Sequence, residues 1–271
     1  MEIKMIFTCP VCGGKLNIDE SRAAKCDNRH SFDSAKQGYY NLLLSGGDHG
    51  DNKEMVLARR SFLGGGFYEP LAKRIAELCR DSIGNEAVIL DAGCGEGYYT
   101  EHLSKEVKPK NAYILAFDIS RDAVREAAKK RCADEYAVAS SYHIPLPDFS
   151  VDMVLNTFSP QAPAETLRVL RRGGFFVMAI PGEEHLFGLK SKIYDTPYKN
   201  EVKDTYIEGF ELILREELRY PLALRSASEV RDLFMMTPYA YRTSKEGRER
   251  VLSLDSLECE AHFIILIYKK V

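Results

Sequence analysis

Residues 88–97 constrain the fold of this chain more than any other segment. They read VILDAGCGEG, an apolar run that stops at Asp91 and is followed by glycines at alternate positions, Gly93, Gly95 and Gly97. The run predicts a buried parallel strand, and the glycines predict a tight turn into a helix. Glycine suits such a turn because the backbone must approach a ligand closely or adopt a positive φ. In an open α/β sheet, nucleotide-like ligands bind at the carboxyl ends of the parallel strands, where such a turn lies.

Two details of the turn argue against a dinucleotide. The pyrophosphate fingerprint is G-x-G-x-x-G, and Tyr98 stands where its third glycine is required. Glu96 adds a carboxylate that would repel a pyrophosphate but suits a cationic ligand with an amino group. The D-x-G-x-G-x-G pattern resembles motif I of class I S-adenosylmethionine (SAM) methyltransferases, whose cofactor carries a sulfonium and no phosphate. The competing interpretation is an ordinary glycine-rich turn.

A second apolar run, residues 113–118, ends at Asp118, 21 residues after Gly97. An acid at the tip of the second strand can accept hydrogen bonds from ribose hydroxyls, and NAD enzymes use one too. Asp118 therefore indicates a ligand that contains a ribose but does not distinguish NAD from SAM. The glycine turn favours SAM. The alternative role of Asp118 is a helix N-cap or first-turn acid before residues 119–122.

The remainder of the chain alternates between strand and helix patterns, which predicts a doubly wound α/β sheet. Strands are expected near residues 87–91, 113–118, 135–139, 152–156 and 174–180, and helices near 98–107, 121–132 and 162–171. Residues 260–268 predict a final strand that inserts antiparallel, with 214–220 as its partner. The pattern of residues 222–256 predicts helices that cover the core and pack their aromatic face against it. The alternative is that Tyr239 or Tyr241 stacks on a base.

Four potential zinc ligands lie near the N-terminus. Cys9, Cys12, Cys26 and His30 are spaced as C-x2-C-x13-C-x3-H, two close pairs separated by a hairpin-sized loop. This pattern is typical of a closed tetrahedral Zn²⁺ site, which folds its module and performs no chemistry. A redox CxxC is the alternative, but it would stand beside a βαβ pattern and would not need the second pair.

Composition narrows the remaining possibilities. The chain has 271 residues, 7 cysteines and a formal net charge of −3. No run reaches transmembrane length and no signal-peptide pattern is present, so we expect a cytoplasmic protein without membrane partners or a disulfide framework. The charge indicates that any RNA binding depends on local patches and shape. The expected units are a zinc-binding recognition domain at 1–45, a linker and helix at 46–66, and a methyltransferase domain at 67–271.

Motifs along nearly the whole chain resemble the bacterial 23S rRNA (guanine-N1)-methyltransferase family, RlmA. Besides the zinc spacing, they are KQGYYNLL at 36–43, ARRSFL at 58–63, GFYEPL at 66–71, DAGCGEGYYT at 91–100, ASS at 139–141, PG at 181–182 with HL at 185–186, and MTP at 236–238. Arg172 departs from the family's PGG turn before the fifth strand. The resemblance implies SAM contacts at Tyr68, the turn of Gly95 and Glu96, and His185. It also implies a class I methyltransferase fold with a mostly parallel seven-stranded sheet and an N-terminal zinc ribbon.

The same resemblance implies a homodimer that acts on a guanine in a 23S rRNA hairpin near the peptide exit tunnel, with one sub-group concerned in macrolide-type resistance. The target base is expected beyond the fourth strand, at the NTFSP sequence of residues 156–160. There Phe158 is a candidate to stack on the base and Asn156 to hydrogen-bond to it, against plain strand-end packing. No general base is identified. The alternative functions are a methyltransferase for a small molecule or protein, and a non-catalytic RNA-binding protein that kept the fold.

Overall fold

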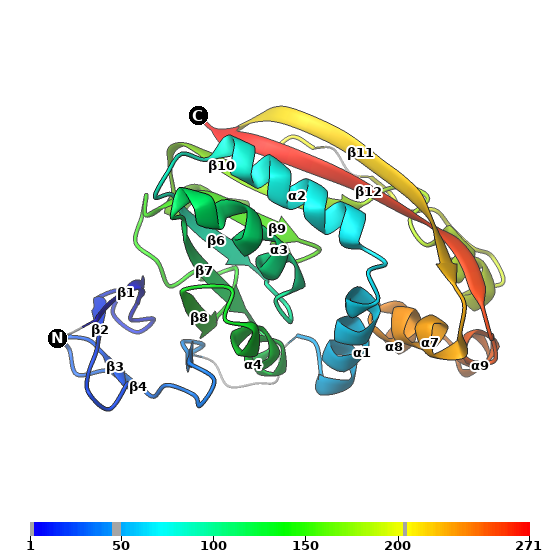
Figure 1. The fold of residues 1–271 in the computed structure, drawn as a ribbon, viewed down its shortest axis with the longest axis horizontal. Coiled ribbons are helices and arrows are strands. Elements are labelled where there is room, and N and C mark those ends of the chain that lie inside the picture. Colours follow the sequence, from blue (N-terminus) through cyan, green and yellow to red (C-terminus); the bar gives the residue numbers. More distant parts are fainter. Residues whose placement is uncertain (1–2, 45–49, 203–204) are drawn as a thin grey trace.

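The computed structural model describes residues 3–44, 50–202 and 205–271, so that residue 45 and residues 46–49 of the expected linker lie outside it. Two sheets organise these residues (Figure 1). A small antiparallel sheet has the order β1 (Ile3–Thr8), β2 (Lys15–Ile18), β3 (Ala24–Lys25) and β4 (Ser31–Phe32). Within the described residues, no helix is both long and apolar enough to cross a membrane.

The large sheet has the strand order β11-β12-β10-β9-β6-β7-β8-β5. Its parallel part consists of β6 (Val88–Ala92), β7 (Tyr113–Asp118), β8 (Glu135–Val138), β9 (Val151–Thr157) and β10 (Leu170–Pro181). The final strand, β12 (Leu257–Lys270), lies antiparallel between β10 and β11 (Phe210–Leu224), which confirms the expected C-terminal arrangement.

An eighth strand extends the seven that were expected. This strand, β5 (Tyr39–Asn41), pairs in parallel with β8, although its residues fall within the segment 1–45 that was expected to form the zinc domain. Sequence analysis did not find it because three residues carry too little periodicity to mark a strand. The chain therefore enters the large sheet directly after the small sheet and before the linker.

The helices lie mainly over one face and one end of the large sheet (Figure 1). They are α1 (Lys53–Gly64), α2 (Glu69–Ser82), α3 (Tyr98–Val107), the 3-10 helix η1 (Lys108–Lys110), α4 (Arg121–Lys130), α5 (Pro163–Val169), α6 (Phe187–Ile193), α7 (Ala227–Met235), α8 (Tyr239–Arg242) and α9 (Lys245–Leu252). The last predicted α/β helix, 162–171, ends two residues early because β10 begins at Leu170. Helices α7 to α9 form the expected excursion, and α1 lies beside α7 and α8.

The small sheet shares a hydrophobic core with the large one. Phe7 and Leu16 are fully buried in the same apolar cluster as Leu115 and Phe117 of β7. The Glu135 carboxylate of β8 accepts hydrogen bonds from the backbone N–H groups of Ile6 (2.7 Å) and Phe7 (3.2 Å), which leaves few unsatisfied groups at the junction. The small sheet is thus docked on the large sheet through buried contacts.

Candidate cofactor site and zinc centre

The glycine turn after β6 adopts backbone conformations that other residues avoid. Gly93 (φ 88°) and Gly97 (φ 82°) both have positive φ, and a side chain on either would meet a neighbour. A Cβ on Gly97 would lie 3.0 Å from Ala127 Cβ, and one on Gly93 would overlap Ser159 Oγ. The turn therefore brings α3 close to α4 and leaves its backbone facing a cavity.

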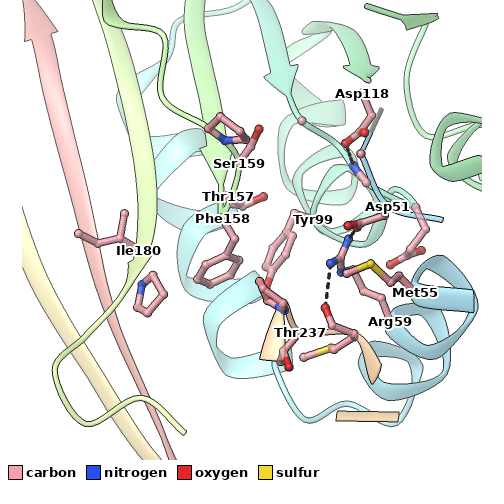
Figure 2. Close-up of a pocket in the computed structure, with 18 of the residues that line it drawn as sticks. Asp51, Met55, Arg59, Tyr99, Asp118, Thr157, Phe158, Ser159, Ile180 and Thr237 are labelled. Carbon is pink, nitrogen blue, oxygen red and sulfur yellow. Dashed lines mark hydrogen bonds and ion pairs between the residues drawn. The ribbon is translucent and has the colours of Figure 1, made fainter. Parts of the chain in front are cut away.

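That cavity has a volume of about 710 Å³ and lies at the carboxyl edge of the parallel strands (Figure 2). Its wall contains most of the predicted cofactor residues: Tyr68, Gly93, Gly95, Glu96, Asp118 and His185. These residues come from four separate elements or turns, which only the folded sheet brings together. A cavity of this size accommodates a nucleoside cofactor together with a second ligand.

Asp118, at the tip of β7, holds the glycine turn and still faces the cavity. Its carboxylate accepts hydrogen bonds from the N–H groups of Gly95 (3.0 Å) and Ser120 (2.8 Å). The N-cap of α4 is Ser120, whose hydroxyl accepts from Ala123 N–H, so the N-cap alternative for Asp118 does not apply. Burial raises the pKa of Asp118. Its remaining lone pairs are suited to ribose hydroxyls.

Tyr68 and His185 form a neutral pair at another part of the wall. His185 Nδ1 accepts a hydrogen bond from the backbone N–H of His262 (3.3 Å), so Nε2 carries the ring proton and donates it to Tyr68 Oη (3.3 Å). Burial lowers the pKa of His185 to about 3 and raises that of Tyr68, so neither side chain is charged near neutral pH. The Tyr68 hydroxyl proton is therefore available to a ligand in the cavity, and no positive charge from this pair repels a sulfonium.

Glu96 does not have the electrostatic role expected from the sequence, which was to attract a cationic ligand. Its carboxylate is almost completely buried and lies 2.7 Å from the ammonium group of Lys130 on α4. The ion pair neutralises the charge that was expected to attract a cationic ligand. Glu96 still lines the cavity together with Asp118. Among the described residues, no Lys or Arg side chain forms an ion pair with Asp118. Lys130 could not be anticipated because it lies 34 residues further along the chain.

The glycine motif places Asp91 and Gly97 among the predicted cofactor contacts, but neither belongs to the described cavity wall. Asp91 instead supports the glycine turn. It is fully buried, its carboxylate accepts a 2.6 Å hydrogen bond from the Thr100 hydroxyl of α3, and it is absent from the described cavity wall. It thus ties β6 to α3 on either side of the glycine turn. Burial raises the pKa of Asp91 from 3.8 to about 7.

Replacing Asp91 with Asn should change how stability depends on pH. A carboxyl whose pKa is raised in the folded state contributes stability that is complete below pH 4 and is lost as the pH rises towards 7. In denaturant unfolding, the free energy of unfolding of wild type should fall by up to about 3 kcal/mol more than that of Asp91→Asn between pH 5 and pH 8. Parallel pH profiles for the two proteins would show that Asp91 does not titrate in this range.

The turn after β9 closes the cavity on the side opposite Asp118 (Figure 2). Thr157, Phe158 and Ser159 line it, whereas the Asn156 amide is buried and donates to the Pro160 carbonyl oxygen (3.3 Å). Phe158 has φ 57° and is 39% exposed, both unusual for an aromatic residue. Strained backbone of this kind is concentrated at ligand sites. The turn therefore presents Phe158 to the cavity, with Asn156 holding its shape.

Residues 50–59 form part of the cavity wall, which the sequence patterns did not predict. The Ser120 hydroxyl donates to the Asp51 carbonyl oxygen (2.6 Å), which fixes this segment beside Asp118. Arg59 of α1 forms an ion pair with the Asp51 carboxylate and donates to the Met236 carbonyl oxygen at 3.0 Å (Figure 2). No local signal marks these residues, because Asp51 lies in a polar, glycine-rich stretch that is typical of a linker.

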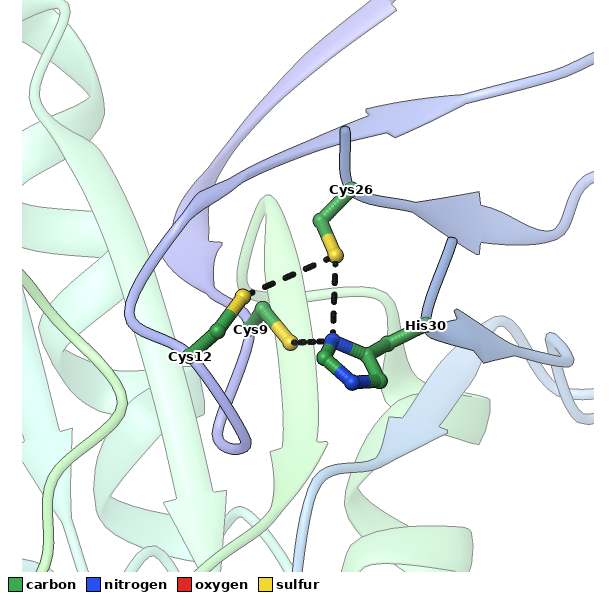
Figure 3. Close-up of side chains that lie close together, drawn as sticks. All are labelled: Cys9, Cys12, Cys26 and His30. Carbon is green, nitrogen blue, oxygen red and sulfur yellow. Dashed lines mark hydrogen bonds between the residues drawn. The ribbon is translucent and has the colours of Figure 1, made fainter. Parts of the chain in front are cut away.

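The four predicted zinc ligands converge in the small sheet (Figure 3). Cys9, Cys12, Cys26 and His30 place their ligand atoms within 4.8 Å of one another. The Sγ atoms of Cys12 and Cys26 are 3.7 Å apart, and His30 Nδ1 is 3.4 Å from the Sγ atoms of Cys9 and Cys26. Tetrahedral ligands with Zn–S bonds near 2.3 Å would be separated by about 3.7 Å, so these three separations are close to those of a tetrahedral Zn²⁺ site.

The fold and these two sites define a class I SAM-dependent methyltransferase with an N-terminal zinc ribbon. A family model described as "RlmA, N-terminal" matches residues 7–44, and a "Methyltransferase domain" model matches residues 90–178. A chain of the solved complex between the Haloferax volcanii Trm112 methyltransferase activator and a methyltransferase superposes with a TM-score of 0.50. It is 16% identical and covers 82% of this chain and 99% of that one, which supports the fold.

More similar relatives specify the family. A 23S rRNA (guanine(748)-N(1))-methyltransferase from Streptomyces fradiae is 34% identical over 80% of this chain and 79% of the relative. A 23S rRNA (guanine-N(1)-)-methyltransferase relative from Bacillus subtilis is 30% identical over 98% of this chain and 97% of its own length. The chain belongs to the 23S rRNA (guanine-N1)-methyltransferase family. In contrast, a malonyl-[acyl-carrier protein] O-methyltransferase from Yersinia pestis matches over only 36% of this chain.

Proposed function

We propose that this protein transfers the methyl group of SAM to N1 of a guanine in a 23S rRNA hairpin. The observation that carries the proposal is that similarity to 23S rRNA enzymes runs through both the zinc ribbon and the methyltransferase domain. A small-molecule or protein methyltransferase would need only the second of these. We extend the proposal to a homodimer, as the family resemblance implies, and to a cytoplasmic location.

The proposed roles of the cavity residues follow from their chemistry. When bound, SAM would supply an electrophilic methyl group: its C–S bond would break, with the electron pair staying on sulfur, as guanine N1 forms the new C–N bond and its proton is released to the bulk solvent. The glycine turn and Asp118 bind the cofactor, with Asp118 accepting hydrogen bonds from the ribose. Tyr68 offers its hydroxyl proton, oriented by His185. The protein's contribution is alignment and exclusion of water.

Phe158 is the proposed surface for the target base. Guanine N1 is occupied in a base pair, so the base must be unpaired or flipped before it can react. Flipped bases are held by stacking on aromatic side chains, and Phe158 presents an exposed ring at the cavity wall. Its ring lies 6.1 Å from that of Tyr99 and 5.6 Å from that of Phe263, which fixes its position.

Mass spectrometry of 23S rRNA from cells with and without the gene tests the function. We expect deletion to remove one N1-methylguanosine and a wild-type copy to restore it. A Phe158→Ala copy should restore it much less efficiently, because losing a base-stacking contact costs about 1–3 kcal/mol. Unchanged 23S rRNA after deletion would refute the proposed function, whereas full restoration by Phe158→Ala would refute only the role of Phe158.

A further inference from the structure

A buried lysine lies behind the aromatic mouth of the cavity. Lys190 on α6 is fully buried, and its ammonium group donates to the Tyr198 carbonyl oxygen (3.2 Å) and Asn200 Oδ1 (2.6 Å). The ammonium also lies 4.5 Å from the ring centroid of Tyr198 and 5.7 Å from that of Tyr239. Among the described residues, none supplies a carboxylate within ion-pair distance of it. Carbonyl oxygens and ring faces therefore balance its charge.

The same lysine fixes the segment that follows α6. The Asn200 side chain, held by Lys190, donates to the carbonyl oxygens of Gly182 (2.9 Å) and His185 (3.3 Å). The Asn200 backbone N–H also donates to the Glu183 carbonyl oxygen (2.9 Å). These bonds attach the segment to the turn that carries His185 into the cavity. Tyr198 is consequently held in a defined position relative to the cofactor residues.

Tyr198 is exposed at this defined position. Its side chain is 54% exposed and lines the mouth of the cavity together with Tyr194, Tyr239 and Arg242. The ring centroids of Tyr194 and Tyr198 are 5.5 Å apart, so Tyr194 supports one side of the exposed ring. The ammonium over the ring draws electron density from it, which favours stacking with an electron-rich purine. A rigid, exposed aromatic ring beside a cation is a typical contact for single-stranded nucleic acid.

We propose that Tyr198 stacks on an unpaired RNA nucleotide next to the target guanine and that Arg242 contacts the adjoining phosphate. This inference rests on the proposed function, because it assumes that the target base enters the same cavity. Phe158 lines the wall and takes the target base, while Tyr198 at the mouth takes its neighbour. Lys190 is a positioning residue that holds the ring from behind. Recognition of RNA through splayed, stacked bases requires such paired aromatic surfaces.

Substituting Tyr198 separates this proposal from a purely structural role. The probe is a 23S rRNA hairpin transcript that contains the target guanine. Tyr198→Ala should raise the KM for the hairpin about 10-fold, with kcat and the SAM affinity within about two-fold of wild type. Tyr198→Phe should keep the wild-type KM because stacking does not need the hydroxyl. Phe149→Ala, which removes a 54% exposed aromatic ring beside Lys270 and outside the described cavity wall, is the matched control and should leave the KM for the hairpin unchanged.

The salt dependence of hairpin binding tests the role of Arg242. Arg242→Ala should reduce the slope of log Kd against log salt by about 1, whereas Tyr198→Ala should leave the slope unchanged. A wild-type KM for Tyr198→Ala, or an equal loss in Tyr198→Phe, would overturn the stacking proposal while hairpin methylation by wild type still supports the proposed function. Absence of hairpin methylation by wild-type protein would overturn both.

Discussion

Cys26→Ser is expected to abolish stoichiometric zinc binding and to unfold the small sheet. Cys26 supplies one of four converging ligands and is also buried in the core that the zinc ribbon shares with β7. Zinc binding in such modules provides about 10–16 kcal/mol, and a module of this size has too little core to fold without it. Metal analysis should show much less than one zinc per chain. Hydrogen exchange should show lost protection in β1 to β4.

The same variant should retain the methyltransferase domain. The cavity wall contains none of the four ligands, so calorimetry should show a SAM affinity within a few-fold of wild type, while rRNA methylation is lost. Cys132→Ser is the matched control, since this half-buried cysteine lies outside the ligand cluster. Full zinc content in Cys26→Ser would contradict the assignment of Cys26 as a zinc ligand, and loss of SAM binding would show that the two domains fold as one unit.

Asp118→Ala is expected to weaken SAM binding about 100-fold, or by about 3 kcal/mol. The substitution removes the carboxylate proposed to bind the ribose, and hydrogen bonds to a charged group contribute about 1.5–3 kcal/mol each. It also leaves the Gly95 N–H without the acceptor that holds the glycine turn in place. Both effects reduce the affinity for the cofactor, which titration calorimetry measures directly.

A neighbouring acid provides the control for Asp118. Asp122→Ala removes a carboxylate from the first turn of α4 that forms a 3.0 Å ion pair with Arg125, and it should leave SAM affinity unchanged. Asp118→Asn should fall between Asp118→Ala and wild type, because the amide oxygen can accept from one N–H or hydroxyl group. Zinc content and thermal stability should be measured on each variant. A wild-type SAM affinity in Asp118→Ala would exclude Asp118 from the cofactor site.

Local patterns were sufficient for the main strands and for both sets of candidate ligands. The run that ends at Asp91 and the one that ends at Asp118 are β6 and β7, because continuous apolar residues are typical of strands buried on both faces. The zinc ligands converge because their spacing allows a short hairpin to bring them together. The partner of Glu96 was not accessible in this way, since no pattern joins it to Lys130.

The sequence by itself determined the class of fold, the cofactor and the zinc ligands, because short-range spacing dictates the strand, turn and hairpin that carry them. Only the tertiary structure decided how the parts meet: β5 beside β8, Asp51 beside Ser120, and Tyr198 over Lys190 at the mouth of the cavity. These contacts depend on how buried faces pack across the sheet. The hydrogen bond between Ile6 and Glu135, for example, joins residues 129 positions apart. Packing at that range leaves no periodic signal in the sequence.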